Sequence, residues 1–391
     1  MTAPQSFQAS EQRIPLWLDC DPGHDDVFAI LIAAHHPNLK LLGISTVHGN
    51  GSIDNVTKNA GSVLRAIGRT DIPVYKGASK PFCRPAIHAE DIHGDSGLDG
   101  TDLLPEPAKP AIVDNKYITA MRDALLAEPK NTAWVVATGT YTNIGLLFAS
   151  YPEVAEHIAG LSLMGGAVGN GFTEVPISLL AGHEKRVGNW TEFAEFNVYC
   201  DPEAAQSIFS SPVLAPKTVI ASLDLTHKVI ATPEVLESIL YVNPQTKESN
   251  NLRQMLYDLL TFFTKTYKEF FGLVDGPPLH DPLAVAAILS NLNVAGRSNE
   301  KFAEVTKLLT FDDREGERFN IDVVTSGKHH PDRVSVGELG RTVVTPVEKE
   351  DLARGGVAIP RGVDLKAFWG IVTDCVKRAD ALNAASLAKE N

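Results

Sequence analysis

The chain has 391 residues, of which 44% are hydrophobic and 21% charged, and its formal net charge is −13. No run of lysine and arginine is long enough to form a basic stripe, which argues against binding to nucleic acid or to an anionic membrane surface. No apolar run approaches the length that spans a bilayer. The length allows one or two globular domains.

The N-terminal residues 1–13 are polar and lack the apolar core of a secretory signal, so we expect them to form a disordered tail. The four cysteines lie far apart, without a CxxC pair: Cys20, Cys83, Cys200 and Cys375. Such cysteines are typical of free thiols in a reducing compartment rather than of disulfides or a zinc site. The sequence therefore favours a cytoplasmic protein, with the nucleus also possible.

From residue 14 onward, short apolar runs alternate with helical patterns. Strands are predicted at 14–19, 39–49, 133–139, 160–166 and 216–225. Helices are predicted at 25–36, 52–68, 142–158, 250–271 and 280–290. Strands that are apolar on both faces and separated by amphipathic helices indicate an α/β fold. We expect an open, mostly parallel, twisted sheet with helices on both faces and a helical decoration at the C-terminus.

Two long irregular stretches, 83–110 and 167–197, interrupt this alternation. Loops of this length inside a compact domain are usually functional or disordered. No linker of biased composition divides the chain, so we expect a single domain over residues 14–378. Residues 379–391 would then form a C-terminal helix or tail.

Polar residues follow several of the predicted strands. In open parallel sheets, ligands bind beyond the carboxyl ends of the strands, so we expect these residues to converge on one crevice. They are Asp19, Asp21, Asp25 and Asp26 at the first strand, His48, Gly49 and Asn50 at the second, Thr138, and Met164, Gly165 and Gly166.

The stretch "DCDPGHDD" places four carboxylates within eight positions, where an apolar strand gives way to an apolar helix. One or two acids at a helix start are ordinary, and each contributes about 0.3–1 kcal/mol. Four would repel one another, and burying uncompensated charge is costly. A bound cation removes that cost, and oxygen ligands without histidine or cysteine indicate Ca²⁺ or Mg²⁺. We also expect Gly23 to let the loop turn tightly, so that the carboxylates point inward.

Other candidate residues have structural explanations as good as the functional ones. Asp281, in "HDP", could bring a further carboxylate to the site, or it could cap a helix as Asp201-Pro202 does. Glu195 and Asn197 would share one side of an extended segment, either in a site or on a surface strand. His93 lies in a glycine-rich loop, where a histidine is commonly solvated.

The first motif resembles the Asp-x-Asp-Pro-Gly-x-Asp-Asp signature of the calcium-dependent nucleoside hydrolases, the inosine-uridine preferring family. Further motifs similar to the family's follow in order over residues 14–375: "TVHGN", "IHGDSG", "ATGTYTNIG", "LMGG", "AEFNVYCDPEAA", "LDLTHK", "HDPLAVA" and "FWG". The whole chain looks like a eukaryotic uridine ribohydrolase of this family. The resemblance implies a Rossmann-like nucleoside hydrolase fold and hydrolysis of the N-glycosidic bond of ribonucleosides such as uridine and inosine, in nucleoside salvage. It also implies Ca²⁺ as cofactor and a homodimer or homotetramer.

The resemblance further implies roles for individual residues. Ca²⁺ would be held by Asp21, Asp26, Asp281 and the main-chain carbonyl of Thr138. Substrate would be bound by Asp25, Asn50, Asn197 and Asp281 at the 2′- and 3′-hydroxyls, Asn189 and Glu195 at the 5′-hydroxyl, Met164 at the ribose, and His93 at the base. Asp21 would be the general base for the attacking water, with inversion at the anomeric carbon, and His280 would protonate the leaving base. Asp19 would orient its neighbours.

One segment departs from the family pattern. An insertion at about residues 168–188 is longer than we expect in the family, and its role is open. The aromatic residue that faces the base is also open, with Tyr267 and Phe271 as candidates.

Two other functions remain possible from the residues alone. The first is a Mg²⁺-dependent Asp-x-Asp phosphohydrolase with Asp19 as nucleophile, although Pro22 stands where a serine or threonine is expected. The second is a Ca²⁺-dependent nucleoside-binding protein without turnover, against which Asp21 and His280 argue.

Overall fold

The computed structural model describes residues 13–295, 304–330, 337–348 and 355–390, together with residues 302 and 333. The expected N-terminal tail lies outside the described residues, apart from Arg13. Within the described part of the chain, no helix is both long enough and apolar enough to cross a membrane.

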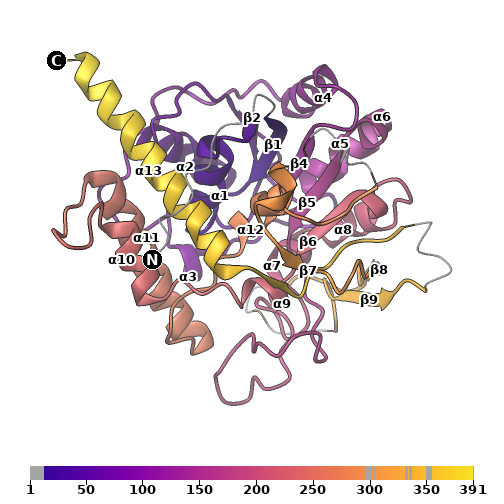
Figure 1. Ribbon diagram of the computed structural model, residues 1–391. Helices are drawn as coiled ribbons and strands as arrows, with labels where there is room; N and C mark the ends of the chain where they lie inside the picture. The colour runs from indigo at the N-terminus through magenta and orange to yellow at the C-terminus, as the bar shows by residue number, and fades with distance from the viewer. Residues whose placement is uncertain are drawn as a thin grey trace.

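A six-stranded sheet in the order β3-β2-β1-β4-β5-β6 forms the centre of the molecule, and all its pairings are parallel (Figure 1). The strands are β1 (Ile14–Cys20), β2 (Leu39–Thr46), β3 (Val74–Lys76), β4 (Trp134–Ala137), β5 (Gly160–Met164) and β6 (Thr218–Ala221). The chain builds outward through β2 and β3 on one side, and through β5 and β6 on the other. The strand order therefore reverses between β1 and β4, which is where open α/β sheets form a ligand crevice.

Helices cover both faces of this sheet, as the sequence predicted. Side chains of β1 alternate between the faces, so that Leu16 and Leu18 enter one core and Trp17 enters the other. The first core contains residues of α1 (Asp26–His35), α2 (Ile53–Ala66), α10 (Pro233–Leu240), α11 (Asn251–Phe271), α12 (Asp281–Ala286) and α13 (Leu365–Glu390). The second contains residues of α4 (Tyr117–Ala127), α5 (Thr142–Ser150), α6 (Pro152–His157) and α8 (Pro202–Phe209).

Short elements complete the described structure. Three one-turn helices lie in the long connections: α3 (Glu90–His93), α7 (Phe196–Cys200) and α9 (Leu223–Thr226). Three 3₁₀ turns are Ala215–Lys217, Ala287–Leu289 and Val305–Lys307. Two antiparallel pairs join β7 (Phe311–Asp312) to β10 (Gly362–Val363), and β8 (Phe319–Val323) to β9 (Thr342–Pro346).

The α/β class and the parallel sheet are confirmed, while several element boundaries differ from the prediction. The single helix expected at 142–158 is two helices, because Pro152 lacks an N–H and disfavours a helical conformation at Tyr151. Strand β3 and helix α4 were not among the predicted elements. Helix α13 continues without a break across residue 378, and its C-terminal end projects beyond the body of the molecule (Figure 1).

Candidate active site

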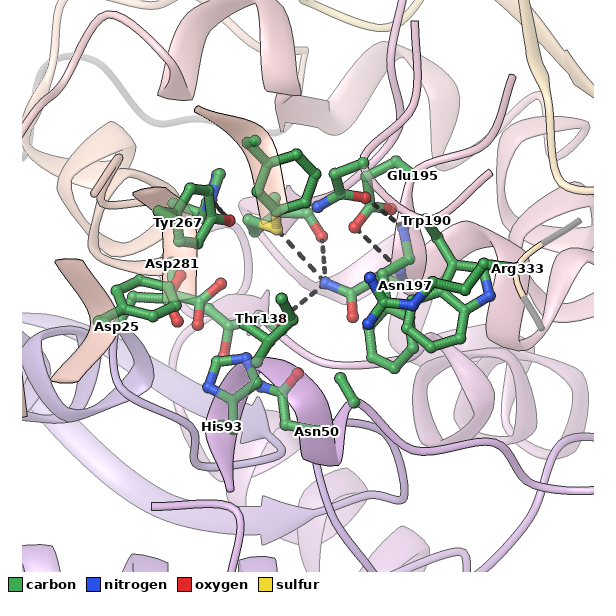
Figure 2. A pocket seen from close by; sticks show the side chains of 18 residues that line it. Asp25, Asn50, His93, Thr138, Trp190, Glu195, Asn197, Tyr267, Asp281 and Arg333 are labelled. Atoms are coloured by element: carbon green, nitrogen blue, oxygen red, sulfur yellow. Dashed lines mark hydrogen bonds between the residues drawn. The ribbon is translucent and has the colours of Figure 1, made fainter. Parts of the chain in front are cut away.

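A pocket opens beyond the carboxyl ends of β1, β4 and β5, and Figure 2 shows the side chains that line it. Ten of the residues predicted for the site line it: Asp25, Asn50, His93, Thr138, Met164, Asn189, Glu195, Asn197, His280 and Asp281. Asp21 and Asp26 do not line it, but both are fully buried and contact residues that do.

Three buried carboxylates gather at one side of the pocket. Asp25, Asp26 and Asp281 each offer an oxygen, and these oxygens lie within 4.8 Å of one another. Burial raises the pKa of Asp25 to about 7, and the charge of Asp26 adds to the shift. Burial, followed by the charges of Asp25 and Asp26, raises the pKa of Asp281 well above its usual range. A metal ion held by these oxygens would compensate the repulsion.

These carboxylates do not cap the helices that they precede or begin. Asp25 stands at the N-cap of α1, yet its side chain makes no capping hydrogen bond there. At α12 the N-cap position is occupied by His280, and Asp281 is the first residue of the helix. Asp201, in the same Asp-Pro pattern, does cap: it accepts a hydrogen bond of 3.1 Å from the Ala204 N–H. The structure therefore distinguishes two Asp-Pro pairs that the sequence could not, and it places only Asp281 in the pocket.

Asp21 is held behind Asn50. Its Oδ2 accepts a hydrogen bond of 2.8 Å from the Asn50 N–H, and its buried Oδ1 has no hydrogen-bond partner among the described residues. A Cβ at Gly49 would collide with the Asp21 carboxylate, so this strand end needs a glycine for close approach. Burial, and then the charge of Asp26, raises the pKa of Asp21 well above its usual range.

We predicted that glycine at position 23 is needed for a tight turn, and this physical reason was wrong. Gly23 is not among the glycines with positive φ. A Cβ there would lie 2.6 Å from His93 Nδ1 and 2.8 Å from Asn50 Nδ2. Glycine is required because the walls of the pocket approach the backbone closely at this point.

His93 is buried at the end of α3 and is not the solvated loop histidine considered from the sequence. Its Nδ1 lies 3.0 Å from Nδ1 of His24, whose Nε2 lies 2.8 Å from the Asp99 carbonyl oxygen. Because a carbonyl only accepts, Nε2 of His24 carries the proton and Nδ1 of a neutral His24 accepts one. The backbone N–H of His24 donates to the same Nδ1 of His93 at 3.3 Å, so this nitrogen of His93 faces two groups of His24.

Glu195, Asn197 and Thr138 form a second buried cluster. Residues 195–197 are not an extended segment: Glu195 caps α7, and its carboxylate accepts hydrogen bonds from Asn197 N–H (2.8 Å), Val198 N–H (3.0 Å) and Gly166 N–H (3.0 Å). The Asn197 Nδ2 donates to the Thr138 carbonyl at 2.8 Å and to the Met164 carbonyl at 3.2 Å (Figure 2). The amide oxygen of Asn197 is therefore the group that can accept a hydrogen bond from a ligand.

Each ring nitrogen of His280 contacts the hydroxyl group of another residue. Thr226 Oγ1 lies 2.7 Å from Nδ1, and Tyr267 Oη lies 2.6 Å from Nε2. Tyr267 and Phe271 both line the pocket, but only Tyr267 contacts His280 in this way. Burial, and then the nearby His227, lowers the pKa of His280 well below its usual range, so the imidazole is neutral.

Comparison with models of protein families identifies the family of the chain that forms this pocket. Residues 16–370 match the model of the inosine-uridine preferring nucleoside hydrolases. The chain belongs to this family. The predicted family and the predicted enzyme class are thereby confirmed.

Relatives of this nucleoside hydrolase include enzymes with named substrates. It is 43% identical to the uridine nucleosidase of Saccharomyces cerevisiae over 279 residues, which are 71% of this chain and 76% of the relative. It is 39% identical to a pyrimidine-specific ribonucleoside hydrolase (RihA) of Escherichia coli over 277 residues, 71% of this chain and 79% of the relative. A probable ribonucleoside hydrolase of Dictyostelium discoideum is 37% identical over 288 residues, 72% and 78% of the two chains.

Solved structures share the fold of this nucleoside hydrolase. The purine-preferring ribonucleoside hydrolase of Gardnerella vaginalis has a TM-score of 0.70 and 24% identity, covering 93% of this chain and 99% of that one. An inosine-guanosine nucleoside hydrolase has a TM-score of 0.68 and 19% identity, covering 93% and 98%. At these identities the likeness concerns the fold alone.

Asp19 is placed in a way that argues against the phosphohydrolase alternative. It is fully buried and does not line the pocket of the nucleoside hydrolase. Its Oδ1 accepts hydrogen bonds from Ser45 Oγ and from Asn143 Nδ2, the latter at 2.7 Å. Burial raises its pKa to about 7. A carboxylate in this position cannot attack a phosphoryl group in the pocket.

The pocket also contains residues that sequence reasoning missed. Phe263 lines it together with Tyr267 and Phe271, and their spacing of four residues on α11 was a signal that could have found it. Trp190 and Arg333 line it as well. The guanidinium carbon of Arg333 lies 3.9 Å from the Trp190 ring centroid. No local pattern indicated Arg333, because only the fold brings it to the pocket.

Proposed function

We propose that this protein hydrolyses the N-glycosidic bond of ribonucleosides to free base and ribose, with uridine as the first substrate to test. The observation that carries the proposal is the grouping of three buried carboxylates with two amide side chains, Asn50 and Asn197, around one pocket. The uridine nucleosidase among its relatives supports uridine in particular.

Ca²⁺ is the cofactor that we propose for the carboxylate cluster. Its donors are oxygen atoms, which suits a hard cation, and the buried Oδ1 of Asp21 still lacks a hydrogen-bond partner among the described residues. Asp21, Asp26, Asp281 and the main-chain carbonyl of Thr138 would hold the ion. A bound Ca²⁺ would lower the pKa of a water molecule and bind the ribose diol.

The remaining roles concern groups of the chain itself. We propose that Asp25, Asn50, Asn197 and Asp281 hold the 2′- and 3′-hydroxyls, that Asn189 and Glu195 hold the 5′-hydroxyl, and that Met164 packs on the ribose. Asp21 would take a proton from the attacking water, and attack from the face opposite the base would invert the anomeric carbon. Buried polar groups that pair with the diol would penalise 2′-deoxy substrates, because these would leave them unpaired.

The leaving base would be stabilised by a chain of neutral hydrogen bonds. In this series of hydrogen bonds, the Thr226 hydroxyl donates to Nδ1 of His280. Nε2–H of His280 then donates to the Tyr267 oxygen, and the Tyr267 hydroxyl donates to the base. His280 thus acts through Tyr267 and not by direct contact with the base. His93, which lines the pocket, would contact the base.

A direct assay tests this function. Purified protein is incubated with uridine, inosine and 2′-deoxyuridine, and the released reducing sugar is measured with and without a chelator. We expect release from the two ribonucleosides, little from the deoxynucleoside, and loss of activity on exhaustive calcium removal that added Ca²⁺ restores. Bound uridine without any released ribose would instead favour a nucleoside-binding protein, and full activity without calcium would overturn the cofactor.

We also propose a cytoplasmic location and a homodimer or homotetramer. All four cysteines are free, and three of them are buried, as is usual in a reducing compartment. Sedimentation velocity of the purified protein would determine the oligomeric state.

A further inference from the structure

The insertion loop, residues 168–188, contacts the short helix α9 at several points. The Asp224 carboxylate accepts hydrogen bonds from Val168 N–H (2.7 Å) and Gly169 N–H (2.9 Å), and Thr173 Oγ1 donates to the Asp224 carbonyl at 3.0 Å. Directly after α9, Nδ1 of His227 lies 3.2 Å from the Pro176 carbonyl oxygen. The loop is therefore attached to the helix that carries Thr226.

The same loop contacts the C-terminal end of α11 three residues later. The Leu179 N–H donates to the Phe271 carbonyl at 2.7 Å, and Ser178 Oγ donates to the same oxygen at 3.2 Å. The last carbonyl groups of a helix have no partner within the helix, so these donors fix the end of α11. That end lies one turn beyond Tyr267.

Through these two attachments, the loop connects the two helices whose side chains contact His280. Thr226 on α9 contacts Nδ1 of His280, and Tyr267 on α11 contacts Nε2. Hydrogen bonds weaken steeply with misalignment, and a catalytic group needs its supports held within about 0.5 Å. A loop that binds both helices is therefore placed to hold the Thr226 and Tyr267 hydroxyl groups at the His280 imidazole at the same time.

We propose that the insertion loop positions the Thr226–His280–Tyr267 chain, and so determines how well the enzyme expels bases that leave poorly. The inference rests on the proposed function, because it assigns the loop a part in leaving-group stabilisation. The loop contains no group of the carboxylate cluster, so its effect is on the departure of the base and not on the binding of the diol.

The test compares two substrates that differ only in the leaving group. Uridine needs hydrogen bonds to the departing base, whereas 4-nitrophenyl β-D-ribofuranoside has a leaving group that does not. The main variant replaces residues 177–183 with two glycines. Thr173→Val removes one attachment to α9. Ser178→Ala removes one attachment to α11, together with the hydrogen bond of Ser178 to His183 within the loop. Glu184→Ala is the control within the loop, because the hydrogen bonds that this exposed carboxylate accepts, from the Gly182 N–H at 3.1 Å and from its own N–H, stay inside the loop.

We expect kcat for uridine to fall at least about 10-fold in the shortened variant, and kcat for the aryl riboside to stay within about twofold. The single variants should show smaller losses with the same selectivity, and Glu184→Ala should match the wild type. The retained aryl riboside activity also shows that the variant is folded. Equal losses on both substrates, or an unchanged rate on uridine, would overturn the inference. A wild-type protein that cleaves neither substrate would overturn the proposed function itself.

Discussion

Tyr267 Oη lies 2.6 Å from Nε2 of His280, and Tyr267 is the one of His280's two hydroxyl partners that lines the pocket. In the tautomer that we propose, the imidazole donates to the phenol oxygen, and the phenol hydroxyl donates to a ligand in the pocket. Both residues are fully buried from solvent, so this short chain is poorly screened.

The first prediction separates the phenol from the ring that carries it. Tyr267→Phe keeps the aromatic packing and removes the hydroxyl, so kcat for uridine should fall about 100-fold, as for the loss of a general acid. His280→Ala should cost about as much, and the double variant little more, because the two groups act as one chain. Steady-state kinetics on uridine and an activated aryl riboside would check this. Tyr257→Phe, on the same helix but outside the pocket, is the control, and additive losses would contradict the chain.

The second prediction concerns Asp281 and uses Asp201 as its counterpart. Asp281→Asn removes one of three clustered carboxylates, so Ca²⁺ affinity should fall at least about 10-fold, or about 1.4 kcal/mol. Without calcium, the Asp281→Asn variant should melt at a higher temperature than the wild type, because the substitution relieves the repulsion among the three carboxylates. Asp201→Ala removes a helix cap, so it should lower the melting temperature and leave Ca²⁺ affinity unchanged. Calorimetric titration and thermal unfolding would measure both, and wild-type affinity in Asp281→Asn would remove it from the metal site.

The third prediction tests the 5′-hydroxyl subsite. Asn189 lines the pocket, and its Oδ1 accepts a hydrogen bond of 3.0 Å from the Phe196 N–H. Asn189→Ala should raise KM for uridine about 10-fold and KM for 5′-deoxyuridine less than about twofold, because only uridine loses a hydrogen bond. Kinetic constants for the two substrates would decide it. An equal rise in both would show that Asn189 supports the loop and not the substrate.

The fourth prediction concerns Arg333, which links separate walls of the pocket. Its guanidinium forms an ion pair with Asp91 and lies over the rings of Trp190 and Phe270, at 3.9 and 5.6 Å from their centroids. Arg333→Met should raise KM for uridine about fivefold and change kcat less than about threefold, because it loosens the walls without touching the carboxylates.

Arg341 is the matched control for Arg333. It also forms an ion pair, with Glu338 at 2.8 Å, and lies 5.9 Å from the ring centroid of Phe193, but it does not line the pocket. Arg341→Met should leave both kinetic constants within about twofold of the wild type. A fall in kcat for Arg333→Met equal to the rise in KM would contradict a role limited to closing the pocket.

The local part of the site could be predicted from the sequence, because an apolar strand followed by four carboxylates is unusual without a ligand. The sequence could not predict the contacts that only the fold creates. The sequence could not tell Asp281 from Asp201, since both precede a proline at a helix start. It could not choose between Tyr267 and Phe271, which share one face of α11, because the choice depends on where His280 lies. Arg333 arrives from a distant segment with no local pattern.

The same contrast holds for the fold. Strands such as β1 and β4 were predicted because they are buried on both faces and read as continuous apolar runs. The edge strand β3 has only three residues and is half-buried, so its sequence carried too little pattern. The insertion loop was found as a departure from the family, but its attachment to α9 and α11 runs largely through backbone groups, which any sequence provides.

The last prediction concerns stability away from the pocket, where Arg253 joins three helices. Its side chain is buried, its Nε donates to Asp380 Oδ2 of α13 at 2.7 Å, and its Nη1 donates to the Ile239 carbonyl of α10 at 2.7 Å. Arg253→Met would remove the cation from the partly exposed Asp380, which keeps its hydrogen bond from Asn250, and would take the buried donor from the Ile239 carbonyl, so the free energy of unfolding should fall by about 1–3 kcal/mol. Lys58→Met, which removes an exposed ion pair with Glu106, should cost less than about 1 kcal/mol. Urea unfolding would measure both variants, and the folded Arg253→Met protein should keep its kinetic constants for uridine, because Arg253 does not line the pocket. Equal stability losses in the two variants would show that burial adds nothing to the strength of this ion pair.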